Sequence, residues 1–382
     1  MVKNKKTKYI SGPYNIIHLR GQIDGLQKDI YIMFDIHNGK EYETPCTDKN
    51  AKDVINFLDK KFKNTKEELD FMIEIHPSDL ISKNWYRNTI YIEKIWTFAR
   101  NAFTMTNDNT TVIKSKQYPN VRIHYIDVRD VYFKLVWVYE FEEIMYNNLT
   151  YEICEQYKNY DVPKQFVKFV FKRIEEITKI LLKSNIKSAE KFNMLQFFSI
   201  NNVNSIHPEE KYKMLKYIVH KTQSRVTNKK LADCLNYIKN EIKLYFNNIK
   251  NNIYAKIMSY KKADTANDLK FFFDMTHKFY IDIIIFSIFL MDLYAIKRII
   301  EKDYIKKIIL YVGGLHATHY IMLLIKFFNF QIISISKNPE SSIPILTEKI
   351  LNNSNLFDIH ETMFWTENIL NQCSDSSPMS DV

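Results

Sequence analysis

Side chains that could carry proton-transfer chemistry stand at the ends of four short apolar runs in the sequence. In chain order these side chains are Asp35, His37, Glu74, His124, Asp127, Arg129, His316 and His319. In parallel α/β sheets, ligands bind beyond the carboxyl ends of the strands. If the four runs are strands of one such sheet, the side chains gather at one edge, where they could act as general acids and bases.

The segment 311–316, Tyr-Val-Gly-Gly-Leu-His, is the most specific of these signals. It contains Gly313 and Gly314, two of only six glycines in the chain. Glycine permits a tight turn and a close backbone approach where a strand leads into a helix. His316 and His319 are three residues apart on the expected helix, so they share a face. Both a functional site and a purely structural turn are consistent with this pattern.

The chemistry that these residue types suggest is hydrolysis. His37 or His316 would take a proton from water, and Glu74 would orient that histidine or act as a second base. Arg298 or Arg129 would stabilise a developing oxyanion. The chain has 46 Lys and only 8 Arg, so an arginine near a strand end suggests that its position requires the planar guanidinium group and not only a positive charge.

A metal-assisted version of this chemistry uses the same residues. His37, His316, His319 and Glu74 are side chains that divalent ions accept as ligands, so a divalent metal is a candidate cofactor. Asp292 lies in an otherwise apolar helix, where a buried carboxylate needs a partner; a structural pairing is the default expectation for it, and it is also a further candidate for the cleft. The sequence has no glycine-rich phosphate loop, serine nucleophile elbow or CxxC motif, which argues against nucleotide hydrolysis, lipase-type chemistry and zinc ribbons.

The elements that would position these residues form an α/β pattern. We expect strands at 14–19, 30–36, 71–75, 121–126, 307–312 and 331–336, and helices at 51–62, 89–103 and 316–328. Asp48 or Asn50 is the expected cap of the first helix. Strand, helix and strand over 307–336 form a βαβ unit, whose two strands should be parallel neighbours. The expected fold is a mostly parallel sheet built from both ends of the chain, with a large all-helical insertion.

The middle of the chain is predicted to be helical, because it has no glycine between Gly39 and Gly313 and its apolar residues recur at helical spacing. The expected divisions are a frayed N-terminus (1–12), a first part of the α/β domain (13–130), a helical insertion (131–270), a second part of the α/β domain (271–372) and a disordered polar tail (373–382). The most apolar segment, 279–296, has an uncharged run of nine residues, whereas a membrane span needs about 20. We therefore expect a buried helix packed on the sheet and no membrane span.

The formal net charge of +10 comes from lysines scattered along the chain. A positive field attracts polyanions without specificity, and no tight basic run extends beyond residues 3–6, so specific nucleic-acid binding is not expected. Cys46, Cys154, Cys234 and Cys373 show no metal or redox spacing, and no apolar region follows the basic start. These features predict free thiols in a reducing compartment.

Segments 34–38, 122–129, 291–294 and 311–316 resemble a family of uncharacterised proteins of giant DNA viruses. The resemblance implies a protein of the host cytoplasm or the virion, not a secreted one. More remotely, the layout is similar to the erythromycin esterase and Tiki protease superfamily. Its ordered His, Glu, Arg and His motifs match His37, Glu74, Arg298 and His316, although Phe34 stands where the first motif has glycine. This similarity implies a hydrolase and leaves metal use open.

Two other classes of function compete with a hydrolase. A viral protein can keep a hydrolase-like scaffold as a virion or host-interaction module, because fold does not imply function. A nucleic-acid binder acting through lysines ranks last, since no arginine-rich or aromatic-interleaved stripe is present. Convergence of His37, Glu74 and His316 in an open pocket would favour an enzyme, and their burial in the core would favour a scaffold. The sequence identifies no partner.

Overall fold

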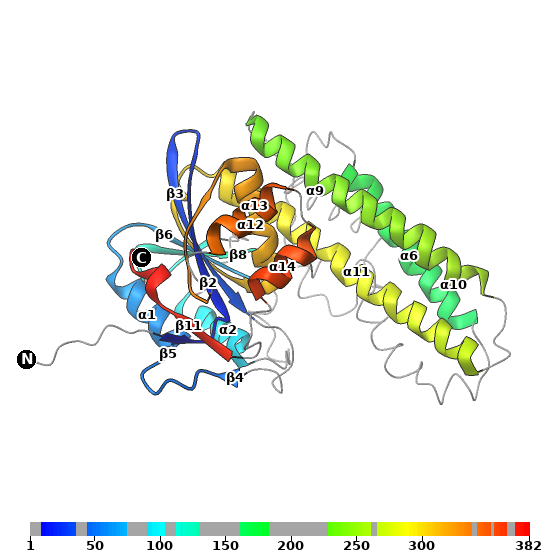
Figure 1. Ribbon diagram of the computed structural model, residues 1–382, viewed down its shortest axis with the longest axis horizontal. Coiled ribbons are helices and arrows are strands. Elements are labelled where there is room, and N and C mark those ends of the chain that lie inside the picture. The colour runs from blue at the N-terminus through cyan, green and yellow to red at the C-terminus, as the bar shows by residue number, and fades with distance from the viewer. Residues whose placement is uncertain are drawn as a thin grey trace, which may run out of the picture. The chain divides into compact units, whose positions relative to one another are not determined.

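The computed structural model describes residues 9–35, 44–74, 90–103, 112–115, 117–127, 129, 161–182, 228–260, 266–337, 342–352, 355–364 and 371–382. The chain divides into two compact units. One unit combines Met1–Asp127 with Arg298–Val382, and the other is Val128–Lys297. Figure 1 shows that the described strands belong to the first unit and that the described part of the second consists of helices.

A seven-stranded sheet forms the centre of the first unit. From edge to edge its strands are β10 (Gln331–Ile335), β2 (Asn15–Ile23), β3 (Leu26–Asp35), β9 (Lys307–Gly313), β6 (Leu69–Ile73), β8 (Val121–Tyr125) and β7 (Val112–Lys114). The strands β3, β9, β6 and β8 are parallel to one another, as predicted for the four strands that end in polar residues. The outer pairs β10–β2, β2–β3 and β8–β7 are antiparallel, so the prediction of a mostly parallel sheet is confirmed only in part, for the four inner strands.

The predicted neighbour relation between strands 307–312 and 331–336 is wrong. β9 lies beside β3 and β6, whereas β10 pairs antiparallel with β2 at the edge of the sheet. The cause is a hairpin between β2 and β3, which turns at Asp24 and Gly25 with φ of 50° and 82°. Because this hairpin occupies the place beside β9, the connection after β9 passes over two strands before β10 can pair.

One face of the sheet is covered by α1 (Val54–Asn64) and α2 (Ile90–Ala102). Their apolar residues join one core cluster with alternate residues of the strands, such as Phe71 and Ile73 of β6. The first turn of α1 is capped by the Asp53 side chain, which accepts a hydrogen bond from the backbone N–H of Ile55, so Asp48 or Asn50 is not the cap. The other face carries α12 (Gly314–Phe328), which packs against β2, β3 and β9 beneath α13 (Ile343–Leu351) and α14 (Leu356–Phe364).

A second, four-stranded sheet joins segments near both ends of the chain. Its order is β4 (Thr44–Pro45), β11 (Asn371–Asp375), β1 (Tyr9–Ser11) and β5 (Lys52–Asp53). The expectation of a disordered tail from 373 is therefore wrong, because β11 and a 3-10 helix (Ser377–Met379) lie there and Met379 is buried in the core cluster. The expected fraying of residues 1–12 is likewise wrong for residues 9–12.

Cys46 and Cys373 form a disulfide within this second sheet, which corrects the prediction of free thiols. The sequence could not reveal the pair, because 327 residues separate the two cysteines. The prediction holds for Cys234, a buried free cysteine in the second unit. Cys154 lies outside the described residues.

The described part of the second unit is helical. It contains α6 (Asp161–Leu182), α9 (Lys229–Asn248), a π-helical segment (Ile249–Tyr254), α10 (Ala255–Ser259) and most of α11 (Ala266–Glu301). Within the described residues, only α11 is long and apolar enough to cross a membrane. In its most apolar window 83% of the residues are buried, as in the core helix of a soluble protein. Packing of α11 on the sheet stays a prediction.

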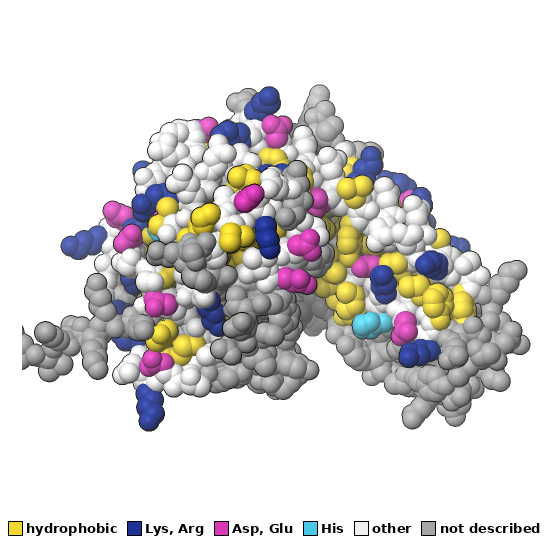
Figure 2. All heavy atoms as spheres, viewed as in Figure 1, with side chains coloured by type: hydrophobic (Ala, Val, Ile, Leu, Met, Phe, Trp, Pro, Cys, Tyr) yellow, Lys and Arg dark blue, Asp and Glu magenta, His cyan; other side chains and the backbone are white. Residues whose placement is uncertain are grey.

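Lysine and arginine side chains are dispersed among acidic ones on the face of the molecule shown in Figure 2. On that face the described residues form no continuous basic stripe.

Candidate functional site

The turn from β9 into α12 lies at the carboxyl edge of the parallel strands and anchors the candidate site. Gly313 ends β9 and precedes the first residue of α12, Gly314. Glu74 directly follows β6, and its backbone N–H donates to the carbonyl of Tyr311 at 3.2 Å. The Glu74 Oε2 atom accepts a hydrogen bond of 2.7 Å from the Gly313 N–H. The glycine turn and the Glu74 carboxylate are therefore held against each other.

His316 reaches the same carboxylate from the first turn of α12. Its Nε2 atom lies 3.5 Å from Glu74 Oε1, so the two oxygens of Glu74 face different partners. The His316 and Glu74 side chains are almost fully buried, with 3% and 2% of their surface exposed. An imidazole beside a carboxylate is the arrangement of a general base and its orienting group, and such contacts are often loose without substrate.

Asp35 meets the turn from the other side. It is the last residue of β3 and pairs in register with Gly313 of β9. Its Oδ1 atom accepts a 2.9 Å hydrogen bond from Nε2 of Gln372, a fully buried residue of β11. Sequence analysis missed Gln372, because nothing in a glutamine beside the expected tail shows that a strand of another sheet brings it to this edge.

His360 of α14 is a second residue that the sequence did not reveal. Its Nδ1 atom is 3.0 Å from the Thr318 hydroxyl, which itself donates to the carbonyl of Gly314 at 2.8 Å. The hydroxyl proton is thus used, so Nδ1 is the donor to Thr318. Burial lowers the pKa of His360 to about 4, outweighing a backbone hydrogen bond at Gly314 that raises it. His360 is therefore neutral at pH 7 and supports the first turn of α12.

Four other predicted residues are buried, and only some of them lie near the carboxyl edge of the sheet. Asp127 follows β8 and is buried at the same edge, where the backbone N–H of Ile126 donates to the carbonyl of Ile73 at 3.1 Å. His319 is fully buried on α12. This helix begins directly after Gly313, which is the condition for His319 to belong to the site. Arg129 and Asp292 are buried and belong to the second unit.

His124 and Arg298 belong to a different group, which lies on the face of the sheet opposite the core cluster. His124 Nε2 and Asp70 Oδ1 are 2.6 Å apart, and Arg298 Nε donates to His124 Nδ1 at 2.9 Å. Arg122 donates to both oxygens of Asp70 at 2.8 Å. Its guanidinium also donates to Glu68 at 2.7 Å and lies over the Tyr304 ring. Asp70 and His124 are fully buried, and all members are joined by direct hydrogen bonds.

The protonation state of this network follows from its contacts. Burial lowers the pKa of His124 to about 4, against a smaller opposing effect of the hydrogen bond to Asp70. Burial raises the pKa of Asp70, but the hydrogen bonds from His124 and Arg122 outweigh burial and hold it below the ordinary value. Because Nδ1 of His124 accepts from Arg298, the neutral ring carries its proton on Nε2 and donates to Asp70.

Arg298 contacts the site only through this network in the described hydrogen bonds. Its partner His124 is level with Met72, two residues before Glu74 along β6. Two residues of strand correspond to about 7 Å. A role of Arg298 beside Glu74 and His316 stays a prediction.

The hypothesis of a metal-assisted hydrolysis depends on four suggested ligands, of which the structure describes only some. Of the four suggested ligands, His316 and Glu74 lie together, whereas His37 lies outside the described residues. Among the residues that the structure describes, no group of three or more His, Cys, Asp or Glu side chains is arranged to hold a metal ion. A divalent metal at this edge stays a prediction.

Comparison with known proteins extends over nearly the whole chain. A model described as "Family of unknown function (DUF5847)" matches residues 8–271 and 266–381. Uncharacterized protein R161 of Acanthamoeba polyphaga mimivirus is 26% identical to this chain, and the match covers 97% of both chains. Uncharacterized protein R160 of the same virus is also 26% identical, over 99% of this chain and 98% of the relative. Uncharacterized protein R706 of the same virus is 24% identical over 98% of this chain and 96% of the relative. No solved structure matches the chain. The matched residues include the large sheet and the glycine turn of the candidate site. The chain therefore belongs to this family of unknown function.

Proposed function

We propose that the protein is a hydrolase whose general base is His316, oriented by Glu74. The observation that carries the proposal is the pairing of these two side chains at the carboxyl edge of the parallel strands, on a glycine turn that leads into a helix. Ligands of α/β sheets bind at this edge. The similarity to the erythromycin esterase and Tiki superfamily supports the same class, since His316 and Glu74 match two of its motifs.

In this proposal His316 carries its own proton on Nε2, the nitrogen that faces Glu74 Oε1, and its Nδ1 removes a proton from a water molecule as the water oxygen attacks an electrophilic carbon or phosphorus. The imidazolium then returns that proton to the leaving group as its bond to the carbon or phosphorus breaks. Glu74 Oε1 stabilises the imidazolium that results, while the Gly313 N–H holds the other oxygen of Glu74 in place. The positive end of the α12 dipole favours negative charge at its first turn. The Gly313 turn has no side-chain cap, so the first backbone N–H groups of α12 are further candidates, beside Arg298, to stabilise an oxyanion.

The test is a hydrolysis screen on the full-length protein with activated ester, phosphoester and amide substrates. We expect His316→Ala to lower kcat/KM for the best substrate by at least about a hundredfold. Glu74→Gln should lower it in the same assay, because the neutral amide no longer stabilises an imidazolium. His277→Ala is the matched control, since His277 is an exposed histidine of α11 and should leave the rate unchanged.

Thermal unfolding of each variant separates catalysis from folding. A His316→Ala protein that keeps its unfolding temperature and loses hydrolysis supports the proposal. A variant that unfolds the first unit, with no rate effect separable from folding, contradicts it. His316→Gln then provides a second variant of closer shape.

A non-enzymatic virion or host-interaction module is the second candidate function. The observation that favours it is burial, because His316 and Glu74 are each at most 3% exposed and a catalytic pair must meet solvent or substrate. Absence of hydrolysis in the screen, together with a strong loss of stability in His316→Ala, would select this function.

A further inference from the structure

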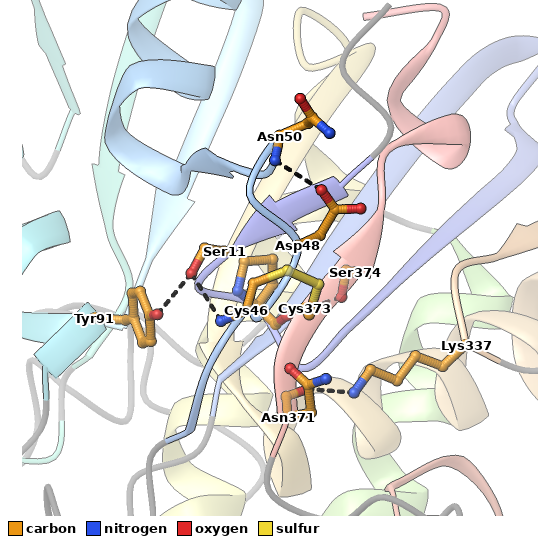
Figure 3. Close-up of a disulfide and its surroundings, with 10 residues drawn as sticks. Ser11, Cys46, Asp48, Asn50, Tyr91, Lys337, Asn371, Cys373 and Ser374 are labelled. Carbon is orange, nitrogen blue, oxygen red and sulfur yellow. Dashed lines mark hydrogen bonds between the residues drawn. A yellow bond between two sulfur atoms is a disulfide. The ribbon is translucent and has the colours of Figure 1, made fainter.

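The disulfide between Cys46 and Cys373 joins two parts of the second sheet that lie far apart in sequence. Cys46 follows the two-residue strand β4, and Cys373 is the central residue of β11. Their Cα atoms are 4.6 Å apart, a normal separation for a disulfide. Figure 3 shows the bond between the two segments, with Ser11 of β1 and Asn371 of β11 close to it.

The two segments differ in how well other contacts hold them. β11 pairs with three residues of β1, and its Ser374 hydroxyl donates to the carbonyl of Pro13 at 2.8 Å. β4 forms a two-residue pairing with β11, and the Cys46 N–H donates to Ser11 Oγ at 3.3 Å. The disulfide is therefore the strongest described link between β4 and the rest of the sheet.

The same link is next to the carboxyl edge of the large sheet. Gln372, adjacent to Cys373, is the residue whose side chain donates to Asp35 beside Gly313. In the second sheet Gln372 pairs with Pro45, the neighbour of Cys46. A change at the disulfide thus acts one residue away from the contact that ties β11 to the end of β3.

We propose that the Cys46–Cys373 disulfide is a reversible redox latch that holds β4, and with it the edge of β11 that carries Gln372, in place. Both cysteines are only partly buried, so a thiolate can reach the bond. Cys234 cannot compete in exchange, because its thiol is fully buried and burial raises its pKa.

Opening the latch is a two-electron reduction by a dithiol. A thiolate of the reductant attacks one sulfur, its second thiol then displaces the other cysteine, and the products are two protein thiols and the cyclic disulfide of the reductant. The large sheet contains no part of this bond, so the reduced protein keeps its main core. The latch does not depend on the hydrolase proposal, because its readouts are structural.

The experiment compares amide hydrogen exchange in the oxidised full-length protein, in the protein reduced with dithiothreitol, and in the double variant Cys46→Ser/Cys373→Ser. We expect exchange in 44–53 and 371–375 to become at least about tenfold faster after reduction, with β6, β8 and β9 unchanged. Alkylation followed by mass measurement should show two new thiols, and reoxidation should restore slow exchange. The double variant should exchange fast under both conditions, and Cys234→Ala should respond like the wild-type protein.

Three results would overturn the latch. Free thiols at Cys46 and Cys373 in protein kept under oxidising conditions would remove the bond itself. Unchanged exchange in both segments after complete reduction would show that the other contacts are sufficient. Faster exchange throughout the first unit would show a permanent staple, on which the whole unit depends, rather than a local latch.

Discussion

Replacement of Asp70 by asparagine tests the buried network that supports the middle of the large sheet. Asp70 is fully buried and receives two hydrogen bonds from Arg122 and one from His124. Asparagine keeps the shape but removes the negative charge, and its NH₂ group would face N–H donors of these partners. Removing one partner of a buried ion pair costs about 3–5 kcal/mol. Because Arg122 keeps its contacts with Glu68 and Tyr304, we expect the lower end, about 3 kcal/mol.

The pH dependence of Asp70→Asn gives a second, independent readout. The folded state holds the pKa of Asp70 below its ordinary 3.8, so its carboxylate contributes stability above that pH and loses the contribution as pH falls through the folded value. The difference in stability between the wild-type protein and the variant should therefore be constant near neutral pH and shrink below pH 3.8.

Urea unfolding, followed by hydrogen exchange of the β6 and β8 amides, measures the free energy of the first unit alone. The matched control is Asp59→Asn, since Asp59 also accepts two hydrogen bonds, from Tyr118 and Lys63, but lies at the surface. The control should lose less than about 1 kcal/mol. A loss below about 1 kcal/mol for Asp70→Asn would refute the conclusion that Arg122 and His124 depend on the buried charge of Asp70.

Three further outcomes are expected. Lys28→Met should lower the free energy of unfolding by at least about 2 kcal/mol in urea titrations. The reason is that the buried Lys28 ammonium donates to three backbone carbonyls at the end of α11 and in the following turn. An unchanged unfolding midpoint would show that water can replace the ammonium group. The free energy of unfolding should fall as the pH is lowered from 6.5 towards 4, by on the order of 3 kcal/mol for His124 alone. With a folded pKa of about 4, His124 takes up its proton in the unfolded state at a higher pH than in the folded state. A free energy that does not change over this pH range would contradict a neutral His124. Gly21→Ala should lower the free energy of unfolding by about 1–3 kcal/mol, because the added Cβ atom would lie 2.5 Å from the Phe330 ring. If that contact is the cause, calorimetry should show that Phe330→Leu restores part of the lost stability.

Much of the local structure could be predicted from the sequence. The alternation and runs of apolar residues located β3, β6, β8 and β9 to within a few residues, and the polar groups after them identified the edge where Glu74 and His316 meet. The pair Gly313-Gly314 marked the turn between β9 and α12 correctly, and the Gly313 N–H in that turn donates to the Glu74 carboxylate. These features depend on residues near one another in the chain, where side-chain periodicity reports which face is buried.

Contacts between distant segments were decided only by the tertiary structure. Arg298 bonds to His124, which is 174 residues away in the sequence, and Asp70 joins them from a third segment. Gln372 and the Cys46–Cys373 disulfide depend on β11 entering a second sheet, which no local pattern indicates. Periodicity shows that a residue faces inward, but it does not show which inward-facing partner will be opposite. That choice follows from how helices and strands pack, since each buried charge must find its hydrogen-bond partner among whatever side chains the packing brings near.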